Sequence, residues 1–174
     1  EAVPEPGNMQ VIPDEDFASN RFIYAASGGC KIYRWAIGGS TSWKDLNPRG
    51  CLRCGGLAQK RGALYGLCSS GVVRTLIPRE EMVTYSDWDR LEVGLAGSVA
   101  FKPSSLRAIS DETIDLWAID DYAYDFEANT GCLWVYSDTF VLQTPWPSSP
   151  AVGGLLACDS CTSQSERFCF RWRE

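Results

Sequence analysis

Short runs of apolar residues alternate with turn-forming residues from residue 17 to about residue 142. Most runs are four to seven residues long and rich in Val, Ile, Tyr and Trp, as is typical of β-strands. Helical periodicity is weak, and the two one-turn candidates, residues 78–82 and 90–93, fit loops better. The pattern predicts an all-β chain. Its strand-like runs are FIYAA, KIYRWAI, ALYGL, GVVRTLI, MVTYSDW, LRAI, IDLWAID, CLWVYS and TFVLQ.

The strand pattern repeats along the chain. Tyr24 in one strand is followed by a Gly turn, by Arg34 in the next strand and by a Trp-x-x-Leu segment, and the same order recurs with Tyr65 and Arg74. A partial third copy is centred on Trp117. A period of about 40–50 residues with four short strands per copy is typical of propeller blades. A β-sandwich with coincidental hairpins is the alternative.

The repeat divides the chain into three parts. Residues 1–16 hold three prolines and five acidic residues, which predicts an extended N-terminal segment with a short strand over residues 9–12. Residues 17–142 hold about three propeller-like blades, and residues 143–174 read as a Pro/Ser/Gly linker with a short C-terminal β segment. A closed propeller needs about 4–8 blades. We therefore expect either a piece of a longer protein or open ends that other chains complete.

One turn of the first copy contains, in order, Tyr33, Arg34, Gly39, Ser42 and Trp43. This order resembles the motif of extracellular Asp-box (BNR-type) β-propeller repeats, which occur in sialidases, sortilin-like receptors and microbial cell-surface proteins. The Asp of the motif is missing, and the stretch contains one extra residue. The resemblance extends over about residues 10–142 and is closest to the microbial surface proteins. The C-terminal segment resembles the start of a fibronectin type III-like domain. These likenesses imply an extracellular or cell-surface location. The matching positions are Tyr33, Arg34, Gly39, Ser42 and Trp43, and Ile37 and Gly38 fill the stretch without Asp.

The amino-acid composition argues against several classes of function. The 174 residues carry a net charge of −6, which argues against a nucleic-acid partner because phosphate binding needs basic surface. The chain has no histidine, so His-based triads, His general bases and His metal sites are excluded. No apolar run approaches the roughly 18 residues of a membrane span. The first residue is not Met and no signal peptide is visible, which fits a processed extracellular chain.

Eight cysteines predict a disulfide-stabilised fold. Two CxxC pairs also suggest zinc, but 104 residues separate them, far more than a zinc ribbon uses. Connectivity is not readable from the sequence. Short loops would be closed by Cys51 or Cys54 with Cys68, and by Cys158 or Cys161 with Cys169. The disulfide candidates are Cys30, Cys51, Cys54, Cys68, Cys132, Cys158, Cys161 and Cys169.

An acidic loop interrupts the third copy. Its oxygen-bearing side chains could hold calcium, but the spacing does not match an EF-hand, and aromatic residues interleave. A solvated loop is the interpretation we favour, so we predict no metal site and no cofactor. The calcium candidates are Asp120, Asp121, Asp125 and Glu127.

Aromatic and arginine side chains offer two further possibilities. A row of tryptophans could stack on sugars, but strand positions favour a core role for all except Trp146, which lies among prolines. A sialidase-type site needs an arginine cluster, a tyrosine nucleophile and a paired acid. Arg34 and Arg74 stand at matching repeat positions, which makes them structural candidates. We therefore predict no catalytic residues. The tryptophans expected in the core are Trp35, Trp43, Trp88, Trp117 and Trp134.

These observations predict a non-enzymatic extracellular structural protein, a self-assembling cell-surface or filament subunit. The expected partner is a second copy, joined through the terminal strands at residues 9–12 and 167–172. A carbohydrate- or protein-binding propeller module, with a glycan among its ligands, is one alternative. A fragment of a glycosidase-type propeller is the other, and an arginine and carboxylate cluster on one face would favour it.

Overall fold

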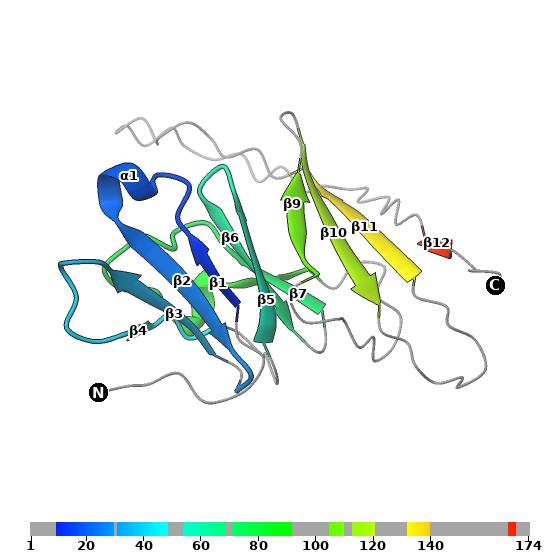
Figure 1. The fold of residues 1–174 in the computed structure, drawn as a ribbon. Helices are drawn as coiled ribbons and strands as arrows, with labels where there is room; N and C mark the ends of the chain where they lie inside the picture. The colour runs from blue at the N-terminus through cyan, green and yellow to red at the C-terminus, as the bar shows by residue number, and fades with distance from the viewer. Residues whose placement is uncertain are drawn as a thin grey trace, which may run out of the picture.

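The computed structural model describes residues 10–29, 31–48, 54–68, 71–91, 105–109, 113–120, 132–139 and 167–169. These residues form three four-stranded antiparallel sheets, which confirms the all-β prediction. In Figure 1 the sheets stand in a row, with the second sheet between the first and the third. Over the described residues the three sheets do not close into a ring.

The first sheet has the order β1-β2-β3-β4. The strands are β1 (Gln10–Pro13), β2 (Phe22–Ser27), β3 (Lys31–Ala36) and β4 (Lys44–Asp45), and helix α1 (Phe17–Asn20) connects the first two. Strand β1 pairs with β2 of its own chain. The first sheet thus begins inside the segment 1–16, where the sequence predicts a short strand over residues 9–12. Ile12 of β1 packs against the core between the first two sheets.

The second sheet has the order β5-β6-β7-β8. Its strands are β5 (Cys54–Lys60), β6 (Ala63–Cys68), β7 (Gly71–Thr75) and β8 (Asp89–Leu91), with a 3-10 turn η1 (Tyr85–Asp87) before the last. Arg61 and Gly62 join β5 to β6 with φ values of 51° and 78°. Two consecutive positive φ angles are what a tight two-residue hairpin requires, because they match the twist of the flanking strands.

The third sheet has the order β12-β11-β10-β9. Its strands are β9 (Arg107–Ile109), β10 (Ile114–Asp120), β11 (Cys132–Asp138) and β12 (Arg167–Cys169). Strand β12 pairs with β11 of its own chain, as β1 pairs with β2. The segments predicted to pair with other chains are therefore used inside the chain, at least over Gln10–Pro13 and Arg167–Cys169.

The register of the sheets matches the sequence repeat. Tyr24 lies opposite Arg34 across β2 and β3, and Tyr65 lies opposite Arg74 across β6 and β7. In the third sheet Trp117 lies opposite Val135. We call the face that carries Tyr24, Tyr65 or Trp117 the forward face of each sheet, and the opposite face its rear face.

The core consists of two layers between the sheets. In each layer the forward face of one sheet packs on the rear face of the next, because side chains of a strand alternate between faces. Trp88, on the rear face of the second sheet, is fully buried, and its indole N–H donates to the carbonyl of Leu46 at 2.7 Å. The first layer contains Tyr24, Ala26, Ile32, Leu46, Leu57, Leu64, Val73 and Trp88, and the second contains Ala63, Tyr65, Leu67, Val72, Leu106, Ile114, Leu116 and Ala118.

The core prediction is wrong for Trp117. Its side chain is 36% exposed, because it lies on the forward face of the third sheet, which no further sheet of the described residues covers. Trp35 and Trp43 are half-buried on the rear face of the first sheet. The side chain of Trp134 and all of Trp146 lie outside the described residues.

Candidate functional site

A buried carboxylate lies between the first two sheets. Asp14 follows β1 and is 2% exposed. The hydroxyl of Tyr24 donates to its Oδ2 at 2.7 Å, and Arg79 donates to both carboxylate oxygens at 3.0 and 2.7 Å. Gln59 of β5 and Asn20 at the end of α1 complete the shell at 2.9 and 2.8 Å. The cluster therefore ties the first sheet to two segments of the second.

The surroundings of Asp14 favour its ionised form. Burial raises the pKa of the carboxyl, but hydrogen bonds from Arg79, Gln59 and Asn20 outweigh it and hold the pKa below its usual value. Burial and the neighbouring Asp14 carboxylate raise the pKa of Tyr24. The phenol thus stays protonated as the donor to Asp14.

A second cluster of similar composition lies between the second and third sheets. Asp138, the last residue of β11, is buried. It accepts a hydrogen bond from the hydroxyl of Tyr65 at 2.9 Å and two from Nη1 of Arg74 at 2.8 and 2.7 Å. The other guanidinium nitrogen of Arg74, Nη2, reaches Asp89 of β8 at 2.6 Å. Both junctions between sheets thus contain a Tyr, an Asp and an Arg.

Arg34 is the repeat equivalent of Arg74, and it likewise contacts a neighbouring part of the chain, the segment between β7 and η1. Its Nη1 donates to the carbonyls of Pro78 and Glu80 at 2.6 and 2.9 Å, and its guanidinium lies 4.7 Å from the ring centre of Phe22. Each of these two arginines bridges neighbouring sheets. Their contacts agree with a structural role.

These clusters are poorly suited to nucleophilic catalysis. A tyrosine nucleophile needs a lowered pKa, whereas burial and the Asp138 carboxylate raise the pKa of Tyr65 and similar causes raise that of Tyr24. Hydrogen bonds to Asp89 and Asp138 outweigh burial and raise the pKa of Arg74. The arrangement holds charges in fixed ion pairs between sheets.

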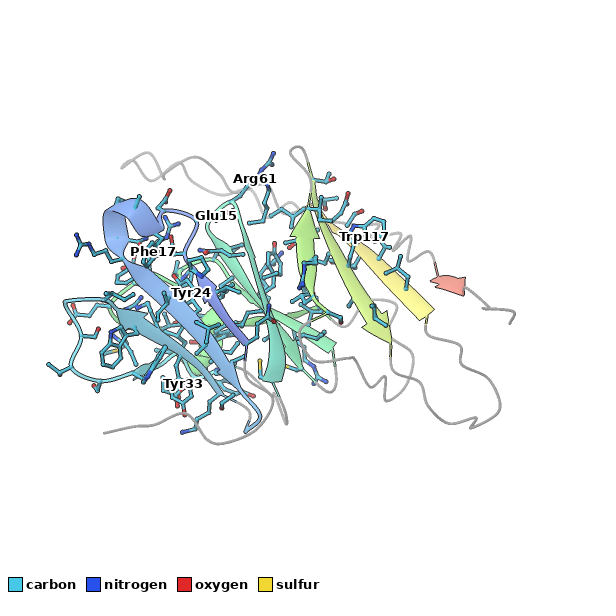
Figure 2. All side chains as sticks on the ribbon, in the orientation of Figure 1. Glu15, Phe17, Tyr24, Tyr33, Arg61 and Trp117 are labelled. Atoms are coloured by element: carbon cyan, nitrogen blue, oxygen red, sulfur yellow. The ribbon has the colours of Figure 1, made fainter. Side chains whose placement is uncertain are left out.

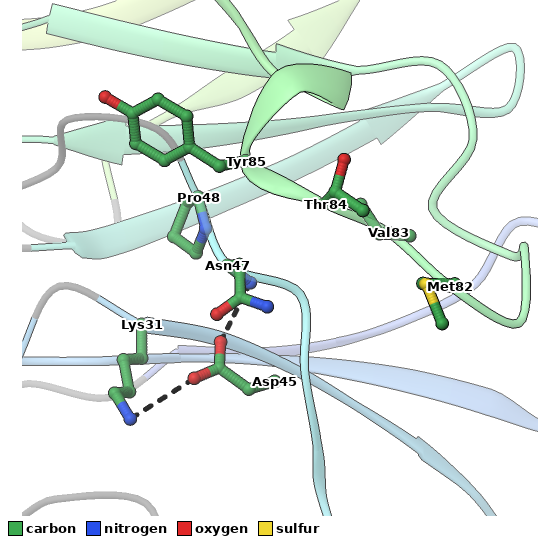
Figure 3. A pocket seen from close by; sticks show the side chains of 8 residues that line it. All are labelled: Lys31, Asp45, Asn47, Pro48, Met82, Val83, Thr84 and Tyr85. Atoms are coloured by element: carbon green, nitrogen blue, oxygen red, sulfur yellow. Dashed lines mark hydrogen bonds and ion pairs between the residues drawn. The ribbon is translucent and has the colours of Figure 1, made fainter.

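An open groove lies where the first sheet meets the segment between β7 and η1 (Figure 3). On one wall the Lys31 ammonium pairs with Asp45 at 3.2 Å, and Asp45 accepts a hydrogen bond from the Asn47 backbone. On the other wall Met82 and Tyr85 are exposed. The groove therefore offers apolar and aromatic surface beside an ion pair.

The forward face of the third sheet exposes apolar side chains beside the charged residues Arg107 and Asp115. Ile109, Trp117 and Ile119 lie on it in adjacent strands, each more than a third exposed. Figure 2 places Trp117 on the sheet farthest from Phe17 and helix α1. In the other two sheets the corresponding tyrosines are 0% exposed.

The cysteine and calcium predictions fall mostly on residues that the structure does not describe. Cys54 and Cys68 are buried Cα partners across β5 and β6, and no disulfide joins these two. Cys132 and Cys169 are Cα partners across β11 and β12. Their side chains, and all of Cys30, Cys51, Cys158 and Cys161, lie outside the described residues. The pairing of the cysteines thus stays a prediction.

Of the calcium candidates, Asp120 ends β10, whereas Asp121, Asp125 and Glu127 lie outside the described residues. Within the described ranges, no group of three or more His, Cys, Asp or Glu side chains is arranged to hold a metal ion. No helix in those ranges is long and apolar enough to cross a membrane.

Sequence reasoning missed the two buried carboxylates. Asp14 lies in an acidic, proline-containing segment, and Asp138 follows a strand in a Ser-Asp-Thr turn, so both look like surface residues. Some of their partners give a signal, because Tyr24 and Tyr65 recur at equivalent positions and Arg74 has its repeat equivalent in Arg34. Arg79, the arginine that binds Asp14, is not the repeat equivalent of Arg74.

Comparisons with known proteins give no match. No family model, no curated protein and no solved structure is similar to this chain.

Proposed function

We propose that this chain is a non-enzymatic extracellular structural protein, a self-assembling subunit of a cell surface or filament. Its sheets would serve as disulfide-stabilised, propeller-type blades. The observation that carries the proposal is the set of apolar side chains exposed on the forward face of the third sheet, at positions where the other two sheets are fully covered. Apolar surface of that kind marks an interaction site.

The energetics favour covering this face. Removing apolar surface from water contributes about 25 cal/mol per Å². The exposed side chains lie on two adjacent strands, so a second sheet could cover them together, as happens twice within the chain. Assembly would thus repeat a type of packing that the chain already uses.

The buried polar groups support the non-enzymatic part of the proposal. Asp14 and Asp138 are bound by arginines and tyrosines that join sheets, and both tyrosine pKa values lie above normal. The rival function, a glycosidase-type propeller fragment, needs a carboxylate pair and an accessible nucleophile beside an arginine cluster.

The mass of the native full chain tests the proposal. Sedimentation velocity over a wide concentration range should reveal species larger than the monomer. A stable monomer at the highest concentration contradicts self-assembly. Turnover of sialosides or other glycosides that is lost on replacing a carboxylate contradicts the non-enzymatic role.

Carbohydrate or protein recognition is the second candidate function, and the groove favours it. Exposed Tyr85 offers a flat aromatic surface of the type that sugars stack on, beside Met82 and the Lys31–Asp45 pair. Binding to a glycan array that Tyr85→Ala abolishes would support it. Unchanged binding, or none, would leave assembly as the better proposal.

A further inference from the structure

The two end faces of the row of sheets are of the two kinds, forward and rear, that pack on each other inside the chain. Inside the chain, each forward face lies against the rear face of the following sheet. Among the described residues, no sheet covers the two faces at the ends of the row: the forward face of the third sheet and the rear face of the first. The structure thus shows twice how a forward face is covered: the rear face of another sheet packs on it.

The forward face of the third sheet departs from the other two in one respect. Where the first and second sheets pair a Tyr with an Arg, the third pairs Trp117 with Val135. Arg34 and Arg74 need carbonyl or carboxylate acceptors on the sheet that covers them. The Trp117–Val135 pair needs none, and Arg107, opposite Trp117 on the edge strand β9, donates to the carbonyl of Leu106 in its own segment at 2.8 Å. The centre of the face therefore needs an apolar complement.

The rear face of the first sheet offers such a surface. Pro13, Ile23 and Trp35 lie side by side across β1, β2 and β3, none of them charged. Val11, 56% exposed, belongs to the same face.

The aromatic residues of the first sheet point to the same conclusion. Trp43 precedes β4 as Trp88 precedes β8, at the same position of the Trp-x-x-Leu repeat. Trp88 is 1% exposed because the first sheet covers it, whereas Trp43 is only half-buried and stacks with Tyr33 and Trp35. Each end face thus carries an aromatic residue that is less buried than its repeat equivalent inside a junction: Trp117 is exposed and Trp43 is half-buried.

We infer that the forward face of the third sheet binds the rear face of the first sheet of a second copy, head to tail. The inference rests on the proposed self-assembly and specifies its interface. A head-to-tail contact uses two different faces, so every added copy presents both again, and the assembly is a ring if it closes and a filament if it does not.

Two blocking variants of the full chain test this interface. Trp117→Arg places a charge on the forward face and Val11→Arg places one on the rear face. Both positions are exposed, so folding should survive, which circular dichroism and thermal melting would check. Met82→Arg is the matched control, because Met82 is 74% exposed and belongs to neither face.

Sedimentation velocity of each variant and of a 1:1 mixture gives the readout. We expect each blocked variant alone to be monomeric at concentrations where the wild type and Met82→Arg assemble. The mixture should form a dimer and nothing larger, because only one compatible pair of faces remains. If either variant fails to fold, Ile119→Arg on the forward face or Ile37→Arg at the end of the rear face replaces it.

The outcomes separate the interface from the function. A monomeric wild type overturns both the proposed assembly and this interface. A wild type that assembles together with blocked variants that still assemble overturns only the interface. Self-dimers of Val11→Arg with no new species in the mixture would mean a symmetric forward-to-forward contact, which also contradicts head-to-tail binding.

Discussion

Arg74 of the second sheet and Asp138 of the third form a buried ion pair, with Nη1 2.7 and 2.8 Å from the two carboxylate oxygens, although 64 residues separate them. The pair joins the end of β11 to the forward face of the neighbouring sheet. Arg74 also contacts Asp89 at 2.6 Å, but the Asp89 side chain is 57% exposed. One guanidinium therefore has one buried and one exposed carboxylate partner.

This difference predicts unequal costs of removing the two carboxylates. Asp138→Ala should lower the free energy of unfolding by about 3–5 kcal/mol, because it leaves a buried guanidinium short of its main partner. Asp89→Ala, the matched control, should cost at most about 1 kcal/mol, because solvent screens an exposed pair. Urea unfolding of both variants measures the difference, and equal losses would contradict it.

Acid should weaken the junction between the first and second sheets through Asp14. The pKa of Asp14 lies below its usual value in the folded protein, whereas an unfolded Asp titrates near pH 4. Its contribution to stability is therefore complete above about pH 5 and is lost progressively as the pH falls toward the folded-state pKa. Asp14→Asn should destabilise the protein most at pH 7, and progressively less as the pH falls below about 4 toward the folded-state pKa. Urea unfolding at several pH values checks this, and a gap that stays constant would refute it.

The close approach of the first two sheets leaves no space at Gly66. A Cβ there would lie 2.5 Å from Cδ1 of Ile32 and 3.1 Å from Cγ2 of Val73. Gly66→Ala should cost about 1–3 kcal/mol of stability, whereas Gly39→Ala, whose nearest neighbours are 3.6 Å away, should change it little. Chemical denaturation of both variants gives the comparison.

Ile32→Val provides a second check on the same contact, because it removes the Cδ1 atom that a Cβ at position 66 would meet. Combined with Gly66→Ala, it should cost less than the sum of the two single changes, by about 0.5 kcal/mol or more. Strict additivity would show that the strain at Gly66 has another source.

The eight cysteines should be oxidised in the native protein. Thiol titration of the freshly denatured, unreduced chain should find at most one or two thiols, with Cys54 the first residue to examine by peptide mapping. Eight titratable thiols would contradict disulfide stabilisation and make metal binding the better hypothesis.

The sequence predicted the strands and their repeat because both depend on local rules. Alternation with a period of two residues fixes which side chains share a face, and short Gly turns fix the pairing of neighbouring strands. The matching registers of Tyr24 with Arg34 and Tyr65 with Arg74 follow from these rules. The structural interpretation of the two arginines also came from their repeat positions.

The packing of sheet on sheet was beyond such rules. Asp14 follows β1 and Asp138 ends β11, and only the approach of a distant sheet brings Arg79 or Arg74 to them and buries the pair. Trp117 has the strand context of a core residue, yet it is exposed because the third sheet is the last in the described row. The pairing of β1 with β2, across helix α1, was likewise not predicted from the sequence.

The sequence by itself determined the all-β class, the strand positions and the repeat, because alternation, turns and hairpin registers act between residues near one another in the chain. Only the tertiary structure decided which faces are buried, which carboxylates pair with the repeated arginines and which aromatic residues stay exposed. Those properties depend on the sheet that lies opposite. That sheet is formed by residues dozens of positions away in the sequence, and no local pattern predicts which sheets pack together.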